Sequence, residues 1–203
     1  MINGITLIHS ASYKDEALDN MAIELRMSGV NVVIKEKPDL GAYAAIEWLL
    51  PTTIVAYVTS GFFNEVGKDL YQLVKNKISD LTANTMKKPR IEPVIYVAGK
   101  KKITDNPFSR ALSISAEATH GRQFKLLIPK YSADIDYDRI IRSFFDFLND
   151  FHLGVITEND IGYKTLGAFD TKIILVHYNK KTNHIEWIDH LPPHVRKNLE
   201  DDD

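Results

Sequence analysis

Hydrophobic and polar residues along the first 34 positions predict a strand, a helix and a second strand. Ile5 to His9 (ITLIH) is short, apolar and β-branched, as expected of a strand. From Ser12 the apolar spacing becomes that of a half-buried helix, which we expect Ser12 to cap, with Asp15 as the acid of a capping box. Gly29 stands where a left-handed residue ends a helix, and VNVVI follows as a strand parallel to the first.

Strands and helices continue to alternate up to about residue 100. The pattern predicts, in chain order, an apolar helix from Gly41 to Leu50 ended by Pro51, a third strand TTIVAYVT, a turn at Ser60-Gly61, a helix from Phe62 to Ile78, an exposed loop from Thr82 to Arg90 and a fourth strand in EPVIYVAG. Such alternation is typical of an α/β fold, and we expect a flavodoxin-like, mostly parallel sheet.

The second half of the chain has a different pattern, which predicts antiparallel hairpins appended to that sheet. The segments that carry it are RALSISAEAT and QFKLLIP around His120-Gly121-Arg122, an aromatic helix from Tyr137 to Phe151, a loop from Thr157 to Gly167, and a second hairpin of TKIILVHY and HIEWID. We therefore divide the chain into an α/β half (1–100), a hairpin–helix–hairpin continuation of the same domain or a subdomain (101–191), and a flexible acidic tail (192–203).

Composition narrows the class of protein more than it defines a function. The formal charge is −2, but Glu200 to Asp203 are all acidic, so the rest of the chain carries 25 basic and 23 acidic residues. That balance does not favour a dedicated nucleic-acid binder. The absence of cysteine excludes disulfides, thiolate zinc sites and cysteine nucleophiles, and together with the lack of a signal peptide it fits a cytoplasmic protein.

One uncharged segment, Trp48 to Phe63, raises the question of membrane insertion. Its 16 residues fall below the roughly 20 that a bilayer-spanning helix needs, and Pro51 interrupts it. We expect a buried passage from helix to strand, and keep a membrane-active effector as an alternative.

The N-terminal half resembles the Toll/interleukin-1 receptor (TIR) family over roughly residues 5 to 80. The matching features are a short strand, a loop with His9, Ser10, Ser12 and Asp15, a helix ended by Gly29, the strand VNVVI, the PDLG segment, and TTIVAYVTSGFF as the third strand. The resemblance implies a flavodoxin-like domain that signals through protein partners or self-association.

Enzymatic members of the TIR family cleave nicotinamide from NAD with a glutamate on the helix after the third strand. The family's Trp-Cys and Glu-Leu arrangement is absent here, and only Glu65 and Asp69 lie in the corresponding region. The resemblance therefore offers these two carboxylates as catalytic candidates, with NAD as substrate, against the alternative that both are solvated residues on a helix.

Ligand contacts are expected where a parallel strand ends and a helix begins. His9, Ser10 and Ser12 occupy that place after the first strand, and Ser60 follows the third. Four histidines between His177 and His194 share no predictable face, so we predict no metal site. The lysines at 100–102 are expected in a solvated loop. No nucleotide-binding fingerprint and no cofactor site is recognised.

These observations leave three hypotheses open. The first is a cytoplasmic TIR-like interaction or signalling module that also binds a small anionic ligand through His9, Ser10, Ser12 or Ser60. The second is an NAD hydrolase that uses Asp69 or Glu65. The third is the membrane-active effector.

Overall fold

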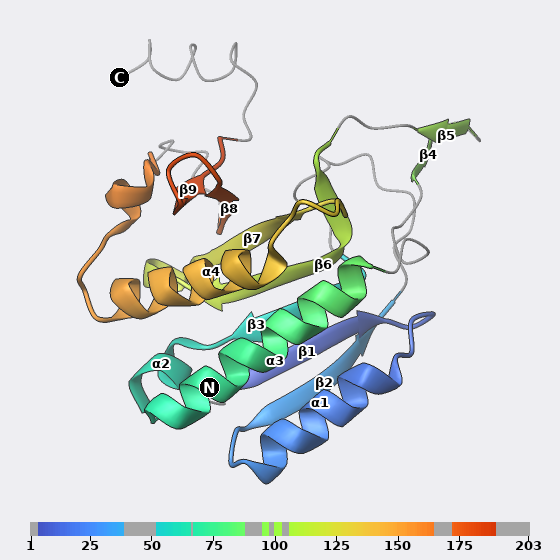
Figure 1. The fold of residues 1–203 in the computed structure, drawn as a ribbon, viewed down its shortest axis with the longest axis horizontal. Coiled ribbons are helices and arrows are strands. Elements are labelled where there is room, and N and C mark those ends of the chain that lie inside the picture. Colours follow the sequence, from blue (N-terminus) through green and yellow to red (C-terminus); the bar gives the residue numbers. More distant parts are fainter. Residues whose placement is uncertain are drawn as a thin grey trace.

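The protein folds around one seven-stranded mixed sheet (Figure 1). The computed structural model describes residues 4–38, 52–65, 67–87, 95–97, 100–102, 106–164 and 172–189. Its elements are β1 (Ile5–Ser10), α1 (Glu16–Met27), β2 (Val32–Lys37), β3 (Ile54–Val58), α2 (Ser60–Glu65), α3 (Lys68–Met86), β4 (Ile95–Val97), β5 (Lys100–Lys102), β6 (Phe108–Glu117), β7 (Gln123–Pro129), α4 (Tyr137–His152), β8 (Ile173–Asn179) and β9 (His184–Trp187), with short 3-10 turns at Thr119–Gly121 and Glu158–Ile161. The α/β class predicted from the sequence is confirmed.

The order of the strands in the sheet is β2-β1-β3-β6-β7-β8-β9. β1 is parallel to β2, as predicted, and β3 is parallel to β6, so two of the three pairings in the N-terminal part of the sheet are parallel. β1 and β3 run antiparallel, with Ile5 opposite Val58 and His9 opposite Ile54. The end of β1 therefore lies beside the start of β3, not beside its end.

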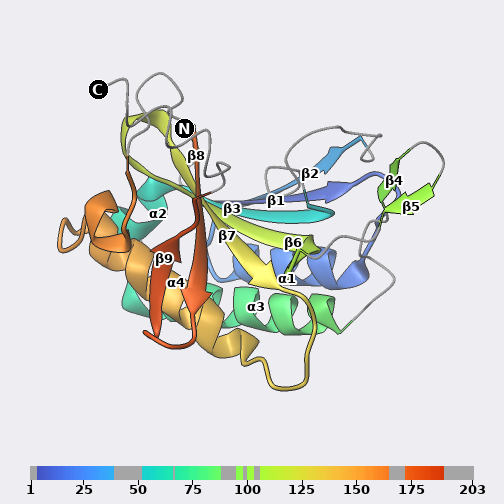
Figure 2. The same cartoon turned by 90° about the horizontal axis from the view of Figure 1, so that it is seen from above.

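Helices α1, α3 and α4 cover the same face of the sheet (Figure 2). Each connects two parallel neighbours, β1 to β2, β3 to β6, and β7 to β8. Among the described residues, the side chains that alternate toward the helices form one core, which includes Leu7, Ala56, Ile114 and Leu126. Alternate residues of the same strands point to the opposite face, on which none of these three helices packs.

α1 begins three residues later than the sequence indicated. Its N-cap is Asp15, whose Oδ1 accepts a hydrogen bond from the N–H of Ala17 (3.0 Å), so the predicted cap at Ser12 is wrong. Ser12 lies earlier, within a tight turn in which the N–H of Tyr13 bonds the carbonyl oxygen of Ser10. The predicted stop is confirmed, because Gly29 has φ +92 and Val30 N–H returns to the carbonyl oxygen of Leu25.

Two segments predicted as loops are regular structure. α3 continues to Met86, because Thr82, Thr85 and Met86 are buried and Thr82 Oγ1 bonds the carbonyl oxygen of Ile78 within the helix. The lysines at 100–102 form β5, which pairs with β4 in a separate two-stranded sheet. The predicted fourth strand thus exists but lies outside the main sheet. The predicted loop from residue 157 contains a 3-10 turn at Glu158–Ile161, and its last three residues lie outside the described ranges.

The two hairpins and the aromatic helix predicted for the C-terminal half are confirmed. β6 and β7 form one antiparallel hairpin and β8 and β9 form the other. α4 buries the predicted apolar face, including Phe144, Phe145 and Phe151. The main sheet contains strands of both predicted halves, because β3 from the first half pairs with β6 from the second. The predicted helix at 41–50 and the tail at 192–203 lie outside the described residues. None of the described helices is both long and apolar enough to span a bilayer.

Candidate functional site

The sequence-predicted site residues lie at two opposite ends of the sheet. His9 and Ser10 end β1 and Ser12 follows it, and His9 Nδ1 donates to the carbonyl oxygen of Ser10 (2.9 Å). Ser10 is buried and its N–H bonds the carbonyl oxygen of Thr53, just before β3. Ser12 is exposed. These residues form the junction between β1 and β3.

Ser60, Glu65 and Asp69 belong to the other end of the sheet, because β3 runs antiparallel to β1. Ser60 and Glu65 are the first and last residues of α2, and Asp69 is exposed in the first turn of α3. The NAD hydrolase hypothesis requires Glu65 or Asp69 to lie close to the loop after β1. The structure places both residues at the opposite end of the sheet from that loop.

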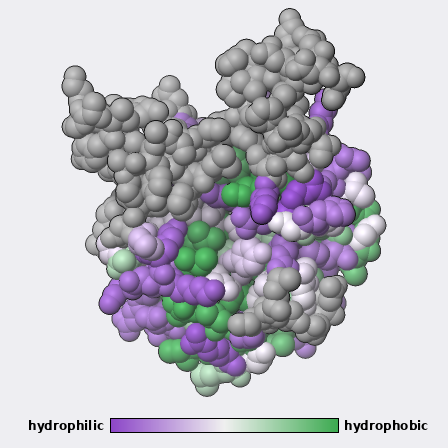
Figure 3. Space-filling view, turned by 180° about the vertical axis from the view of Figure 1, so that it is seen from behind, coloured by the Kyte–Doolittle hydropathy of each residue, from purple (hydrophilic) through white to green (hydrophobic). Residues whose placement is uncertain are grey.

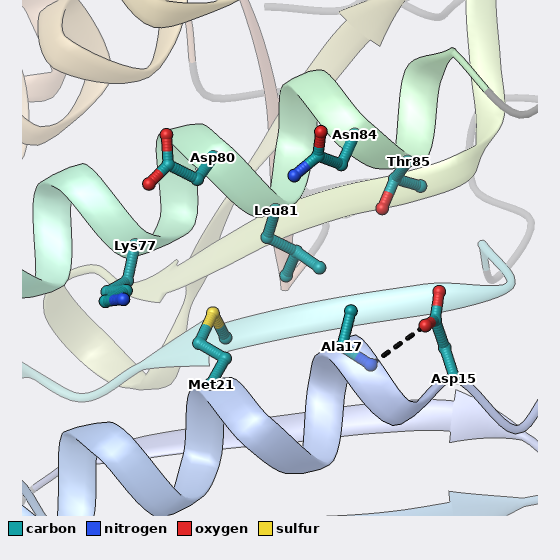
Figure 4. A pocket seen from close by; sticks show the side chains of 8 residues that line it. All are labelled: Asp15, Ala17, Met21, Lys77, Asp80, Leu81, Asn84 and Thr85. Atoms are coloured by element: carbon teal, nitrogen blue, oxygen red, sulfur yellow. Dashed lines mark hydrogen bonds between the residues drawn. The ribbon is translucent and has the colours of Figure 1, made fainter.

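A cavity of about 260 Å³ lies between α1 and α3, close to the loop after β1 (Figure 4). Met21 and Leu81 point toward each other across it, and Asp15 points from the start of α1 toward α3. Asp80 also lines the cavity. Lys77 also lines the cavity but is ion-paired with Glu24. Because Asp15 caps the helix and adds a negative charge to that of Asp80, this cavity does not suit the anion expected at the start of α1.

The face of the sheet opposite the helices is rich in buried polar side chains. In β6, Leu112, Ile114 and Ala116 point into the core, while Ser113, Ser115 and Glu117 point to the opposite face. Ser113 and Ser115 are both buried there. Figure 3 shows this side of the molecule, on which hydrophilic and hydrophobic described residues are interspersed.

Lys125 lies at the centre of this face. It is directly opposite Ser115 on one side and Leu175 on the other, and only 7% of its surface is exposed. Burial, with a smaller effect from the positive charge of Lys37, lowers the pKa of its ammonium from 10.5 to about 8. A lysine in this position costs free energy when charged, unless an acceptor of negative charge lies nearby.

Lys37 extends along the same face from the edge of the sheet. It is paired with Ser10 at the ends of β2 and β1, and its Nζ donates to the carbonyl oxygen of Thr52. Burial also lowers the pKa of Lys37. The charge of Lys37 acts on Lys125 although their strands are separated by β1, β3 and β6.

Residues with hydroxyl groups lie between the two lysines in the sheet. Thr52 Oγ1 and Ser113 Oγ share a hydrogen bond of 2.7 Å, and Ser115 is the next residue of β6 on this face. We call Lys37, Thr52, Ser113, Ser115 and Lys125 the lysine–hydroxyl track. Thr52 Oγ1 donates its proton to the carbonyl oxygen of Ile54 (2.7 Å) and accepts from Ser113 Oγ, so the donors that the track offers are the two ammonium groups and the hydroxyl of Ser115. Ammonium and hydroxyl donors of this kind bind the oxygens of a phosphate.

A carboxylate cluster adjoins the track. Glu117 Oε2 accepts hydrogen bonds from the N–H of Ser60 (2.8 Å) and from its Oγ (2.5 Å), and the hydroxyl of Tyr57 also donates to this carboxylate. Burial opposes ionisation, but these hydrogen bonds lower the pKa of Glu117, so it is charged at neutral pH. Burial and the Glu117 charge raise the pKa of Tyr57 to about 12.

Sequence reasoning missed the track, although two signals for it exist. Lys125 stands between Phe124 and Leu126 in a strand that otherwise reads QFKLLIP, where a charge is unusual. The period of two in LSISAE places Ser113 and Ser115 on one face, a sign of a polar surface on an otherwise apolar strand.

Comparisons of this chain with protein-family models, with curated proteins and with solved structures found no match.

Proposed function

We propose that this protein is a ligand-binding module that holds a small phosphorylated or otherwise multiply charged anion against the lysine–hydroxyl track. The observation that carries the proposal is the position of Lys125, a nearly buried lysine on the side of the sheet opposite the helices, in line with Ser115 and affected by the charge of Lys37. We therefore propose the track, and not the loop after β1, as the binding place of the anionic ligand expected from the sequence.

The electrostatics of the track support an anion as the ligand. Two ammonium groups whose charges act on each other in a poorly solvated environment repel, and an anion between them converts that repulsion into two charge-assisted hydrogen bonds. Ser113 Oγ donates to Thr52 Oγ1, which in turn donates to the carbonyl oxygen of Ile54, so these bonds hold the start of the track in place before a ligand arrives and leave the contacts with the ligand to Lys37, Lys125 and Ser115. A preorganised site of this kind loses less entropy on binding.

The ligand-binding role belongs to the first hypothesis, an interaction or signalling module. In that reading, the bound anion alters the ability of the module to contact a protein partner or a second copy of itself. The NAD hydrolase and membrane-active readings remain predictions from the sequence.

Isothermal titration calorimetry with pyrophosphate at pH 7.5 tests the proposal. Lys125→Met removes a charge-assisted hydrogen bond of about 1.5–3 kcal/mol, so we expect it to bind roughly 10- to 150-fold more weakly than the unmodified protein. Lys35→Met is the matched control, because Lys35 is an exposed lysine on the same strand as Lys37. Equal affinity of the two variants, or no binding of pyrophosphate to the unmodified protein, would refute the proposal.

A further inference from the structure

The surface next to the track selects the chemical class of the anion. β6 and β7 place two polar cross-strand pairs in succession, Ser115 opposite Lys125 and Glu117 opposite Gln123. All four residues lie on the face opposite the helices, since their neighbours Ala116 and Phe124 are in the core. Diagonal neighbours on one face of an antiparallel pair are roughly 7–8 Å apart, so Glu117 and Lys125 can contact one small molecule.

The two pairs offer complementary chemistry. The first pair provides an ammonium group and a hydroxyl, which are donors for phosphate oxygens. The second provides a carboxylate and an amide, which accept and donate hydrogen bonds and suit the hydroxyls of a sugar. Resting on the proposed function, we propose that the ligand is a phosphorylated sugar, free or within a nucleotide, with its phosphate at Lys125 and its hydroxyls at Glu117 and Gln123.

The cluster around Glu117 holds the carboxylate in a fixed position for this role. Both hydrogen bonds from Ser60 end on the same oxygen, Oε2. A carboxylate has about four acceptor positions on its two oxygens, so capacity remains beyond the bonds from Ser60 and Tyr57. Because the group is charged and anchored to the start of α2, it accepts hydrogen bonds from a sugar without first having to be ordered.

The test compares ligands that share a phosphate and differ in hydroxyl groups. Ribose 5-phosphate and glycerol 3-phosphate carry hydroxyls, and propyl phosphate has the same chain length as glycerol 3-phosphate but none. Calorimetry should give an affinity about tenfold higher for ribose 5-phosphate than for propyl phosphate, and a smaller preference in the same direction for glycerol 3-phosphate. Glu117→Gln should abolish these preferences without weakening the binding of propyl phosphate, since it removes a negative charge near the phosphate.

A second variant keeps the test independent of the structural role of Glu117. Gln123→Met leaves the bonds between Ser60 and Glu117 intact, and it should weaken the binding of ribose 5-phosphate more than the binding of propyl phosphate. Equal affinities for all three ligands would overturn the sugar assignment and leave the anion site standing. Failure of every phosphate to bind would overturn both.

Discussion

Replacing Lys125 with methionine should flatten the dependence of stability on pH between 7 and 9.5. Methionine has a similar length and no charge, so it removes the buried ammonium while filling much of the same space. The native pKa of Lys125 is about 8 against 10.5 in the unfolded chain. Above pH 8 the unfolded chain therefore binds more protons than the native protein, and stability rises with pH.

The size of this effect follows from the pKa values. Over the pH range in which the unfolded chain holds the proton and the native protein does not, the free energy of unfolding rises by about 1.4 kcal/mol per pH unit. From pH 7 to 9.5, Lys125 should increase the free energy of unfolding by about 2 kcal/mol, most of it above pH 8. Lys37 adds a rise of the same sign to both proteins, because burial lowers its pKa too.

Urea unfolding followed by circular dichroism at pH 7.0, 8.0, 9.0 and 9.5 measures the difference. The measurements stop at pH 9.5 because of Tyr57, whose pKa is raised to about 12. Above pH 10 its ionisation in the unfolded chain would lower the free energy of unfolding, which is the opposite of the effect of Lys125. Lys35→Met, which removes an exposed lysine, should keep the full rise. If Lys125→Met and Lys35→Met gained the same stability over this range, the account of Lys125 as a charge held in a poorly solvated position would be refuted.

Three further predictions follow from the contacts of the described residues. In urea unfolding, Tyr71→Phe should stabilise the protein by about 1 kcal/mol or leave its stability unchanged, because the Tyr71 hydroxyl is buried without a hydrogen-bond partner. Tyr137→Phe should destabilise the protein by about 1 kcal/mol, because the Tyr137 hydroxyl bonds the carbonyl oxygen of residue 130. The opposite order of the two stabilities would contradict the reasoning. Asp15→Ala should cost about 1 kcal/mol and lower the melting temperature, whereas Ser12→Ala should have almost no effect; equal losses would mean that Ser12 shares the cap. Because exposed Asp69 lies at the opposite end of the sheet from the loop after β1, we expect no release of nicotinamide from NAD at high protein concentration, and turnover that disappears in Asp69→Ala would restore the hydrolase hypothesis.

The β1–α1–β2 unit was predictable because its information is local. The apolar period changes between β1 and α1, and the left-handed φ at Gly29 favours the residue type found there. The N-cap was misplaced because Ser12 and Asp15 are both good caps. The choice depends on the turn from Ser10 to Tyr13, and Ser10 is itself held by a bond to Thr53, which is distant in the sequence.

The direction of β3 could not be read from the sequence. An apolar strand such as IVAYV has the same pattern in both directions, and the connection from β2 is long enough for a parallel or an antiparallel neighbour. That direction decides which residues meet. It places Ser60 beside Glu117 and separates it from Ser10, so candidates chosen by their position after a strand ended up at opposite ends of the sheet.

The lysine–hydroxyl track could not be predicted from the sequence for a related reason. Its members come from β2, the start of β3, β6 and β7, and they share a face only once the order of the strands is known. Lys125 was visible in the sequence as an unusual charge, but nothing local relates it to Lys37.

The titration of Lys125 itself tests the central claim most directly. NMR of protein carrying ¹³C at the lysine Cε, with Lys125→Met to assign the resonance, follows this one ammonium group with and without saturating pyrophosphate. The account predicts a midpoint near pH 8 in the free protein and a clearly higher midpoint in the complex, because a bound anion stabilises the charged form. A midpoint near 10.5 in the free protein, or one that pyrophosphate leaves unchanged, would contradict it.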